Sequence, residues 1–149
     1  MEFSVATTAD IPELCTILGS LFTQEVEFTP DHNLQTQGLT AVISGQGVGA
    51  ILLARDGGET VAMINLLYTI STALGGRVAI LEDMVVSRSA QGQGVGTKLM
   101  EFALDFARDN GCKRITLLTD SDNTGAHRFY QRHGFARSSM VVMRKSIDQ

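Results

Sequence analysis

SAQGQGVGTK, residues 89–98, has a glycine at every second position of its centre, at 92, 94 and 96. An apolar stretch precedes it, and apolar residues at helical spacing follow it. The first amides of a helix lack partners and favour an anion, and glycine lets a bulky group approach the backbone closely. The stretch therefore predicts a strand, a phosphate-binding loop and a helix in succession. A plain glycine-rich turn is the alternative interpretation.

Two familiar phosphate loops do not fit these residues. A dinucleotide fingerprint, G-x-G-x-x-G, needs glycine where Thr97 stands, and an acidic residue about twenty positions later, where residues 112–116 contain none. A nucleotide P-loop needs lysine directly after its last glycine, whereas Thr97 separates Gly96 from Lys98. Both patterns are therefore excluded.

The patterns on either side of the loop predict one α/β domain over residues 1–149. Helices are expected at 11–22, at 34–44, from Val95 to the stop at Asn110-Gly111, and at 124–132. Strands are expected at 3–6, 50–54, 60–70, 78–86, 115–119 and 139–144. Asp10 and Glu13 have the spacing of a capping box for the first helix.

Composition excludes several classes of protein. The net charge is −4 and the basic residues are scattered, so no binding to nucleic acid is expected. The longest apolar run, residues 61–67, is broken by Asn65, and the first residues lack an export signal, which predicts no membrane span and a cytoplasmic location. Cys15, Cys112 and the three histidines lack the spacing of metal ligands, so no metal is expected.

Two motifs in the right order resemble those of the GNAT superfamily of acyl-CoA-dependent N-acyltransferases. The first, Q/R-x-x-G-x-G/A, stands as QGQGVG at residues 91–96. The second, N-x-x-A-x-x-x-Y-x-x-x-G-F, is carried by Asn123, Ala126, Tyr130, Gly134 and Phe135. The resemblance implies a mixed, mostly antiparallel sheet of about six to seven strands, flanked by about four helices, with a splayed central strand pair that binds acyl-CoA.

The resemblance also implies which residues bind acetyl-CoA, the acetyl donor. The loop would bind its pyrophosphate through backbone amides, and the residues concerned are Gln91, Gly92, Gln93, Gly94, Val95, Gly96 and Thr97. The pantetheine arm would lie along the end of the preceding strand, at Met84, Val85 and Val86. The remaining residues of the cofactor-binding set are Asn123, Ala126 and Tyr130.

Acyl transfer to an amine needs an acid for the leaving thiolate and a base for the amine. The resemblance makes Tyr130 the acid, since a phenol with a pKa of about 10 can protonate a thiolate whose conjugate acid titrates at about 8.5; packing alone is the alternative. Glu82 and Asp83 are adjacent acids in an apolar strand, and alternation would send them to opposite faces. We favour Glu82 as the base over Asp83. A salt bridge to Arg77 or Arg114 is the alternative use of these carboxylates.

Two further features concern the acceptor side. A backbone N–H near Val85 or Val86 would hold the oxyanion that develops during acyl transfer. The loop that contains Glu25, Glu27 and Phe28 could hold a cationic amine, and a solvated acidic loop is the alternative interpretation.

These patterns together predict an N-acetyltransferase that moves an acetyl group from acetyl-CoA to a primary amine by direct attack in a ternary complex. Small-molecule amines and peptide amines fit the sequence equally well as acceptors. A non-catalytic acyl-CoA sensor of the same fold and, more remotely, a nucleotide-binding enzyme with the same glycine loop are the alternatives. The resemblance also allows a homodimer in which the apolar last strand pairs across an axis.

Overall fold

The computed structural model describes residues 1–24 and 31–148 of the chain. The chain divides into two units that are each compact by themselves, Met1–Leu118 and Thr119–Gln149. The first unit contains β1 (Glu2–Val5), η1 (Thr8–Asp10), α1 (Ile11–Gln24), α2 (His32–Ser44), β2 (Gly49–Asp56), β3 (Glu59–Ser71), β4 (Gly76–Val86), η2 (Arg88–Ala90), α3 (Val95–Asp109) and β5 (Ile115–Leu117). The second unit contains α4 (Thr124–Arg132). The expectation of a single domain over residues 1–149 stays a prediction.

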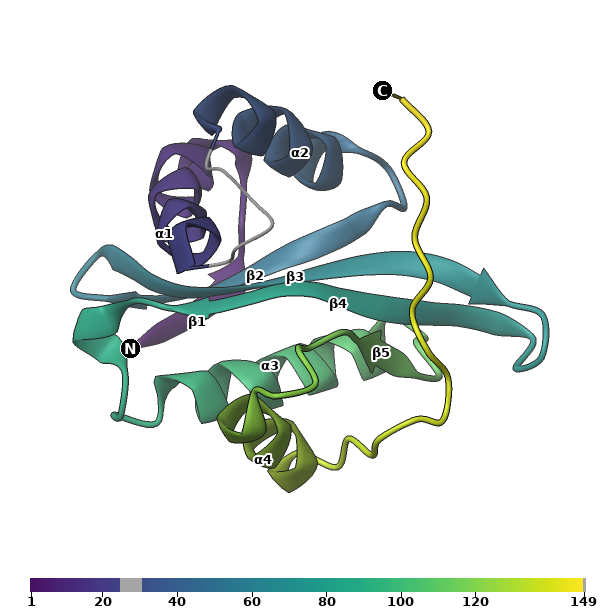
Figure 1. The fold of residues 1–149 in the computed structure, drawn as a ribbon. Coiled ribbons are helices and arrows are strands. Elements are labelled where there is room, and N and C mark those ends of the chain that lie inside the picture. Colours follow the sequence, from purple (N-terminus) through teal and green to yellow (C-terminus); the bar gives the residue numbers. More distant parts are fainter. Residues whose placement is uncertain (25–30, 149) are drawn as a thin grey trace. The chain divides into compact units, whose positions relative to one another are not determined.

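The strands form one mixed sheet in the order β1-β2-β3-β4-β5 (Figure 1). Neighbouring strands are antiparallel from β1 to β4, whereas β4 and β5 are parallel. The mostly antiparallel sheet and the four α-helices confirm the predicted α/β class. The expected count of six to seven strands was too high, because the described residues form five.

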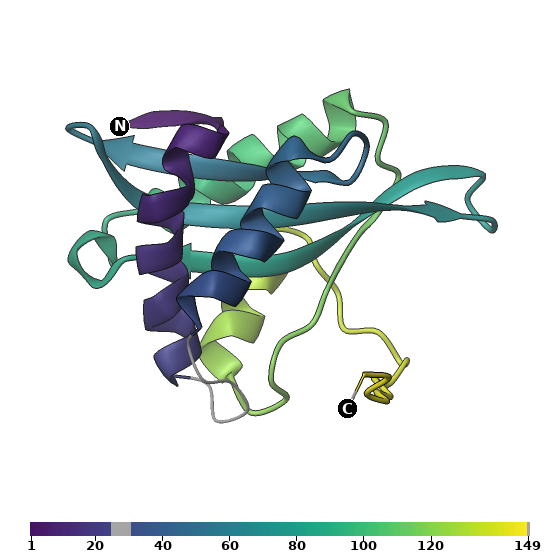
Figure 2. The same ribbon diagram turned by 90° about the horizontal axis from the view of Figure 1, so that it is seen from above.

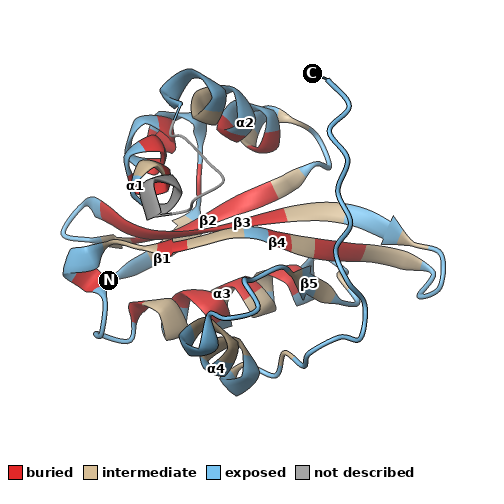
Figure 3. Cartoon of the chain, viewed as in Figure 1, coloured by how far each residue is buried: buried red, intermediate tan, exposed pale blue. Residues whose placement is uncertain are grey.

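Helices cover both faces of the sheet in the first unit. Figures 1 and 2 show α1 and α2 side by side on one face and α3 on the other. The core on the α1/α2 face joins both helices to the central strands, and its members include Leu14, Cys15, Leu18, Leu39, Val42, Ile51, Leu53, Met63 and Val85. The side of α3 that packs on the sheet carries Val95, Leu99, Met100, Ala103 and Ala107, all buried (Figure 3). A strand between two such layers is covered on both sides, which explains why residues 60–66 of β3 are buried without alternation.

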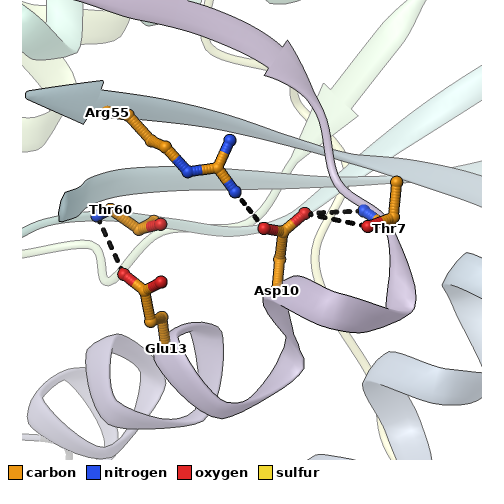
Figure 4. A network of polar contacts seen from close by, with 5 residues as sticks. All are labelled: Thr7, Asp10, Glu13, Arg55 and Thr60. Carbon is orange, nitrogen blue, oxygen red and sulfur yellow. Dashed lines mark hydrogen bonds and ion pairs between the residues drawn. The ribbon is translucent and has the colours of Figure 1, made fainter. Parts of the chain in front are cut away.

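A polar network fixes the start of α1 to the β2–β3 hairpin (Figure 4). Asp10 accepts a hydrogen bond from the backbone N–H of Thr7 at 2.7 Å and forms an ion pair with Arg55. Glu13 accepts the backbone N–H of Thr60 at 3.0 Å. The expected capping box of Asp10 with Glu13 was therefore wrong, because Asp10 caps the preceding turn and Glu13 reaches across to β3.

The second unit departs from the prediction after α4. Residues 139–144 form no strand with any described residue, although their apolar and β-branched content predicted one. A strand needs a neighbour to take its backbone hydrogen bonds, which propensity alone does not supply. Met140 and Met143 of this segment are 85% and 91% exposed, so they do not pack as residues of a buried strand would.

Candidate active site

The ladder between β4 and β5 is shorter than β4 itself. Its last pair joins Leu81 to Leu117, while β4 continues to Val86. Residues 82–86 therefore have β3 on one side and no strand of the described chain on the other. The edge is open because β5 ends at Leu117, and a splayed strand pair that binds acyl-CoA stays a prediction.

A β-bulge at Glu82 decides which backbone groups face that open edge. Leu81 pairs with Leu66 and Asp83 pairs with Asn65, so Glu82 is the extra residue of β4. The hydrogen bonds agree, since the N–H of Ala79 points toward the β5 side, to the Arg114 carbonyl at 2.9 Å, and that of Ser87 points toward β3.

In a regular strand, residues 79 and 87 would point their N–H groups to the same side, because they are an even number of positions apart. They point to opposite sides, so the alternation of the N–H groups is reversed at the bulge. Counting back from Ser87, the N–H of Val85 points toward β3, and those of Met84 and Val86 point toward the open edge. Of the two residues expected to supply an N–H to the oxyanion, Val86 therefore has a suitable orientation and Val85 does not. Met84 is the second residue with a suitable orientation.

Because of this bulge, the carboxylates of Glu82 and Asp83 have different environments. Glu82 is exposed, whereas Asp83 is half-buried and lies opposite Asn65, whose Nδ2 donates to Asp83 Oδ2 at 3.2 Å. Asn65 also pairs with Ile51, a member of the core under α1 and α2, so Asp83 lies on that face of the sheet. Strict alternation along β4 was therefore the wrong basis for placing Glu82 and Asp83.

Burial raises the pKa of Asp83 above its usual range, and the nearby Glu82 adds to this increase. The hydrogen bond from Asn65 acts in the opposite direction, because it favours the ionised carboxylate. The alternative salt bridges are not formed, since neither carboxylate has an ion pair within the described residues. Arg77 instead lies over the ring of Tyr68, 4.2 Å from its centroid.

The glycine loop joins η2, which follows the open edge of β4, to α3. Gly92 and Gly94 have φ values of 77° and 79°, a conformation that glycine adopts without strain. Two side chains brace the loop against the backbone before it. Gln91 Nε2 donates to the carbonyl of Val86 at 3.1 Å, and Gln93 Nε2 donates to the carbonyl of Ser89 at 3.0 Å.

The start of α3 carries unpaired donors. The first helical hydrogen bond runs from the N–H of Lys98 to the carbonyl of Gly94. Gly94 is the N-cap and has no side chain to take the amides of the first turn, which belong to Val95, Gly96 and Thr97.

An added Cβ at Gly92 or Gly94 would meet no atom within 4 Å, so the space before these amides is open. The exposed Lys98 adds positive charge nearby. Free donors, open space and a helix dipole fit a pyrophosphate.

The second unit holds the remaining predicted residues on α4. Asn123 is the N-cap of α4, and its Oδ1 accepts the N–H of Ala126 at 3.1 Å. The ring of Tyr130 makes edge contacts with Phe129 and Phe135, at centroid distances of 5.4 Å and 5.8 Å. Burial raises the pKa of Tyr130, which keeps its phenol protonated to higher pH.

Other expectations concern features outside this site. The loop with Glu25, Glu27 and Phe28 lies outside the described residues. In residues 1–24 and 31–148, no three His, Cys, Asp or Glu side chains come together as metal ligands would. None of the helices described is long and apolar enough to cross a membrane.

Residues 11–135, which include the open edge, the glycine loop and α4, match the model of the Acetyltransferase (GNAT) family. The chain belongs to the GNAT family. It is 30% identical to an uncharacterized N-acetyltransferase, YhfO, of Bacillus subtilis, over 95% of this chain and 94% of that protein. It is 28% identical to an aminoalkylphosphonate N-acetyltransferase of Salmonella typhimurium, over 92% and 86% of the two chains.

The fold agrees with solved GNAT structures. An aminoglycoside N-acetyltransferase solved in complex with CoA superimposes with a TM-score of 0.81 at 14% identity, covering 97% of this chain and 93% of that one. The GNAT fold and the N-acetyltransferase relatives make this GNAT chain an acyltransferase, of a family that moves acetyl groups to amines.

Two structural features of this GNAT site were not predicted from the sequence. Gln91 was expected to act through its backbone amide, and its side chain also ties the loop to β4. Asn65 was noted only as a break in an apolar run, although a buried polar side chain in such a strand is itself a signal of a specific partner. That partner is Asp83.

Proposed function

We propose that this GNAT protein transfers the acetyl group of acetyl-CoA to a primary amine by direct attack in a ternary complex. The observation that carries the proposal is the open edge of β4, which leads through the short turn η2 into a braced glycine loop and a helix whose N-cap has no side chain. An extended thioester arm needs backbone partners along a strand, and its pyrophosphate needs donors at the strand's end. Both are supplied by consecutive residues of one chain.

The residues proposed to hold acetyl-CoA come from this continuous segment. The amides of the loop and of the first turn of α3, residues 91–97, would bind the pyrophosphate. Met84 and Val86 would pair with the arm through backbone groups that face the open edge, and Val85 would pack beside it. Asn123 and Ala126 are proposed to contact acetyl-CoA because they carry the second family motif. The bound coenzyme supplies an acetyl group activated as a thioester.

We propose Asp83, rather than Glu82, as the group that takes the proton from the amine. Asp83 has a raised pKa, is held by Asn65 and lies on the face covered by α1 and α2. A base is most effective when its pKa is closer to the working pH, which favours the carboxylate with the raised pKa. Glu82 is exposed at the bulge and is the alternative base.

The chemical balance of the reaction needs one further proton donor. The new bond joins the amine nitrogen to the acetyl carbonyl carbon, and the bond from that carbon to sulfur breaks. The departing thiolate takes a proton, for which Tyr130 is proposed because it carries the tyrosine of the family motif. Its raised pKa means that Tyr130 is protonated and ready to donate across the neutral pH range.

The acceptor proposed is a small molecule with a primary amine. The support is the similarity to the aminoalkylphosphonate N-acetyltransferase, which covers most of both chains. A cytoplasmic location and the absence of a nucleic-acid partner stay predictions from composition.

The test is release of free thiol from acetyl-CoA in the presence of single amines, followed by mass spectrometry of the product. The panel contains an aminoalkylphosphonate, an amino sugar, a polyamine and a peptide with a free N-terminus, with reactions lacking amine as the control. An N-acetylated product with one class supports the proposal and names the acceptor. Tight binding of acetyl-CoA by calorimetry without any product would contradict it and favour the sensor.

A further inference from the structure

Asn65 is a buried polar residue within an otherwise apolar stretch of β3. It is 8% exposed, and the residues beside it, Ile64 and Leu66, are fully buried. Its Nδ2 donates to Asp83 at 3.2 Å, while its Oδ1 is buried without a hydrogen-bond partner among the described residues. A buried amide oxygen that has lost water without gaining a donor lowers stability. Asn65 is therefore a poor choice for packing alone.

The orientation of the amide follows from the chemistry of its partner. An ionised carboxylate only accepts hydrogen bonds, so the nitrogen of Asn65 must face Asp83 and the oxygen must face away. The unpartnered oxygen is thus a consequence of directing the N–H toward Asp83. An apolar side chain at position 65 would avoid this cost but would leave the carboxylate without its donor.

The bulge selects which carboxylate receives this hydrogen bond. In a regular ladder that continues from the Leu66–Leu81 pair, Asn65 would lie opposite Glu82 and Asp83 would face the side of α3. The extra residue shifts the register by one, so Asp83 takes the position opposite Asn65. The bulge and Asn65 therefore act on the same carboxylate.

Few charged groups act on Asp83 from the elements around it. Glu82 is the charged neighbour on its own strand. The residues that α1 and α2 contribute to the core on this face are uncharged, and β5 is uncharged from Ile115 to Leu117. Glu13 of α1 is used by the backbone of Thr60. The hydrogen bond from Asn65 is thus the main favourable contact of the ionised carboxylate within the described residues.

We propose that Asn65 is a positioning residue, which holds the carboxylate of Asp83 in place and in its ionised form so that it can accept the proton of the amine. The role rests on the proposed function, in which Asp83 is the base. It assigns to β3 a part in catalysis that the family motifs, which lie on β4, the loop and α4, do not include.

The test compares two variants of nearly the same shape, Asn65→Val and Asn65→Thr. Valine and threonine both suit a buried strand, and only threonine has a hydroxyl that can donate to Asp83. In Asn65→Val, the acidic limb of kcat/KM for the amine should move up by about half a pH unit or more, because the ionised form has lost its donor. Asn65→Thr should restore part of the shift, and the KM for acetyl-CoA should stay within about twofold in both variants.

Thr60→Val is the matched control, since Thr60 is also a buried polar residue of β3 with an unpartnered side-chain oxygen. Thr60 pairs with Arg55 of β2 and with no residue of β4, so its substitution should leave the pH profile unchanged. An unshifted acidic limb in Asn65→Val, or loss of the folded protein in that variant, would assign Asn65 to the architecture and overturn the proposal.

A second measurement separates this inference from the proposed function. The pKa of Asp83 is read directly by carbon NMR of the carboxyl group in the free enzyme, wild type and Asn65→Val, without any substrate. A higher pKa in Asn65→Val supports the link between the two residues even if no amine in the panel is acetylated. An unchanged pKa would overturn the link even in an active enzyme.

Discussion

The side-chain amide of Gln91 donates to the carbonyl oxygen of Val86 at 3.1 Å, which joins the glycine loop to the last residue of β4. The bond fixes the distance between the strand that would hold the arm of acetyl-CoA and the amides that would hold its pyrophosphate. Binding of a long ligand at two such places depends on their separation being preorganised.

Gln91→Ala should therefore weaken acetyl-CoA binding by about three- to tenfold, the range expected for one hydrogen bond. Calorimetric titration measures this directly. Gln93→Ala is the comparison, because the Gln93 side chain bonds to Ser89 within the turn and does not reach the strand. A loss in Gln93→Ala as large as that in Gln91→Ala would show that the tie to β4 has no special role.

Gly94→Ala separates backbone strain from ligand binding. Gly94 and Gly111 have φ values of 79° and 80°, and an added Cβ meets nothing within 4 Å at either position. Each alanine variant should thus lose about 1–2 kcal/mol of stability from strain alone. Gly94→Ala should in addition lose about tenfold or more in acetyl-CoA affinity, because the methyl group enters the space before the amides of α3. Equal affinities in the two variants would contradict the pyrophosphate site.

Asp10→Ala tests the network at the start of α1. The substitution leaves Arg55 and the N–H of Thr7 without their partner, so the free energy of unfolding should fall by about 1–3 kcal/mol. Asp105→Ala removes an exposed ion pair with Arg108 and should cost about 0.5 kcal/mol or less. Urea unfolding of both variants gives the comparison, and a similar loss in the two would mean that the network adds no more than a surface pair.

The sequence predicted well those features that depend on local patterns. The helix at residues 124–132 was found with the same ends, and the glycine loop was located because positive φ values at Gly92 and Gly94 demand that residue. The bulge at Glu82 could not be predicted, since it depends on the register between β3 and β4 and not on either strand alone. The expectation that Glu82 and Asp83 point to opposite faces rested on alternation, which the bulge interrupts, whereas the preference for Glu82 came from the resemblance to the family. The last expected strand failed for a related reason, because β-propensity does not supply a pairing partner.

Tyr130→Phe tests the proposed acid. Phenylalanine keeps the ring that contacts Phe129 and Phe135, so turnover should fall by about tenfold or more while the affinity for acetyl-CoA barely changes. An acid works only while protonated, and burial raises the pKa of Tyr130. The alkaline limb of the wild-type kcat profile should thus lie above the usual tyrosine pKa of about 10, and it should be absent from Tyr130→Phe.

Tyr68→Phe is the control, because Tyr68 is the other tyrosine of the chain and its pKa is also raised by burial. It should leave turnover and the alkaline limb unchanged. Full activity in Tyr130→Phe would exclude Tyr130 as the acid and leave it a packing role.

Asp83→Asn should remove activity and increase stability at neutral pH. The pKa of Asp83 in the folded protein lies above its value in the unfolded chain, so the folded state binds the proton more tightly. The contribution of Asp83 to stability is thus fully present below the ordinary aspartate pKa and is lost as the pH rises through the raised value. The asparagine variant has no charge to bury, so it should be more stable than wild type at pH 7 to 8, and the difference should close toward about pH 4.

Urea unfolding across this pH range measures the stability difference, and kcat/KM for the amine should fall about tenfold or more in the same variant. Glu82→Gln is the comparison for kcat/KM, since Glu82 is exposed at the bulge and is the alternative base. A stability difference that stays constant or grows on acidification would contradict the raised pKa of Asp83. A larger loss of kcat/KM in Glu82→Gln than in Asp83→Asn would make Glu82 the base, as the sequence had favoured.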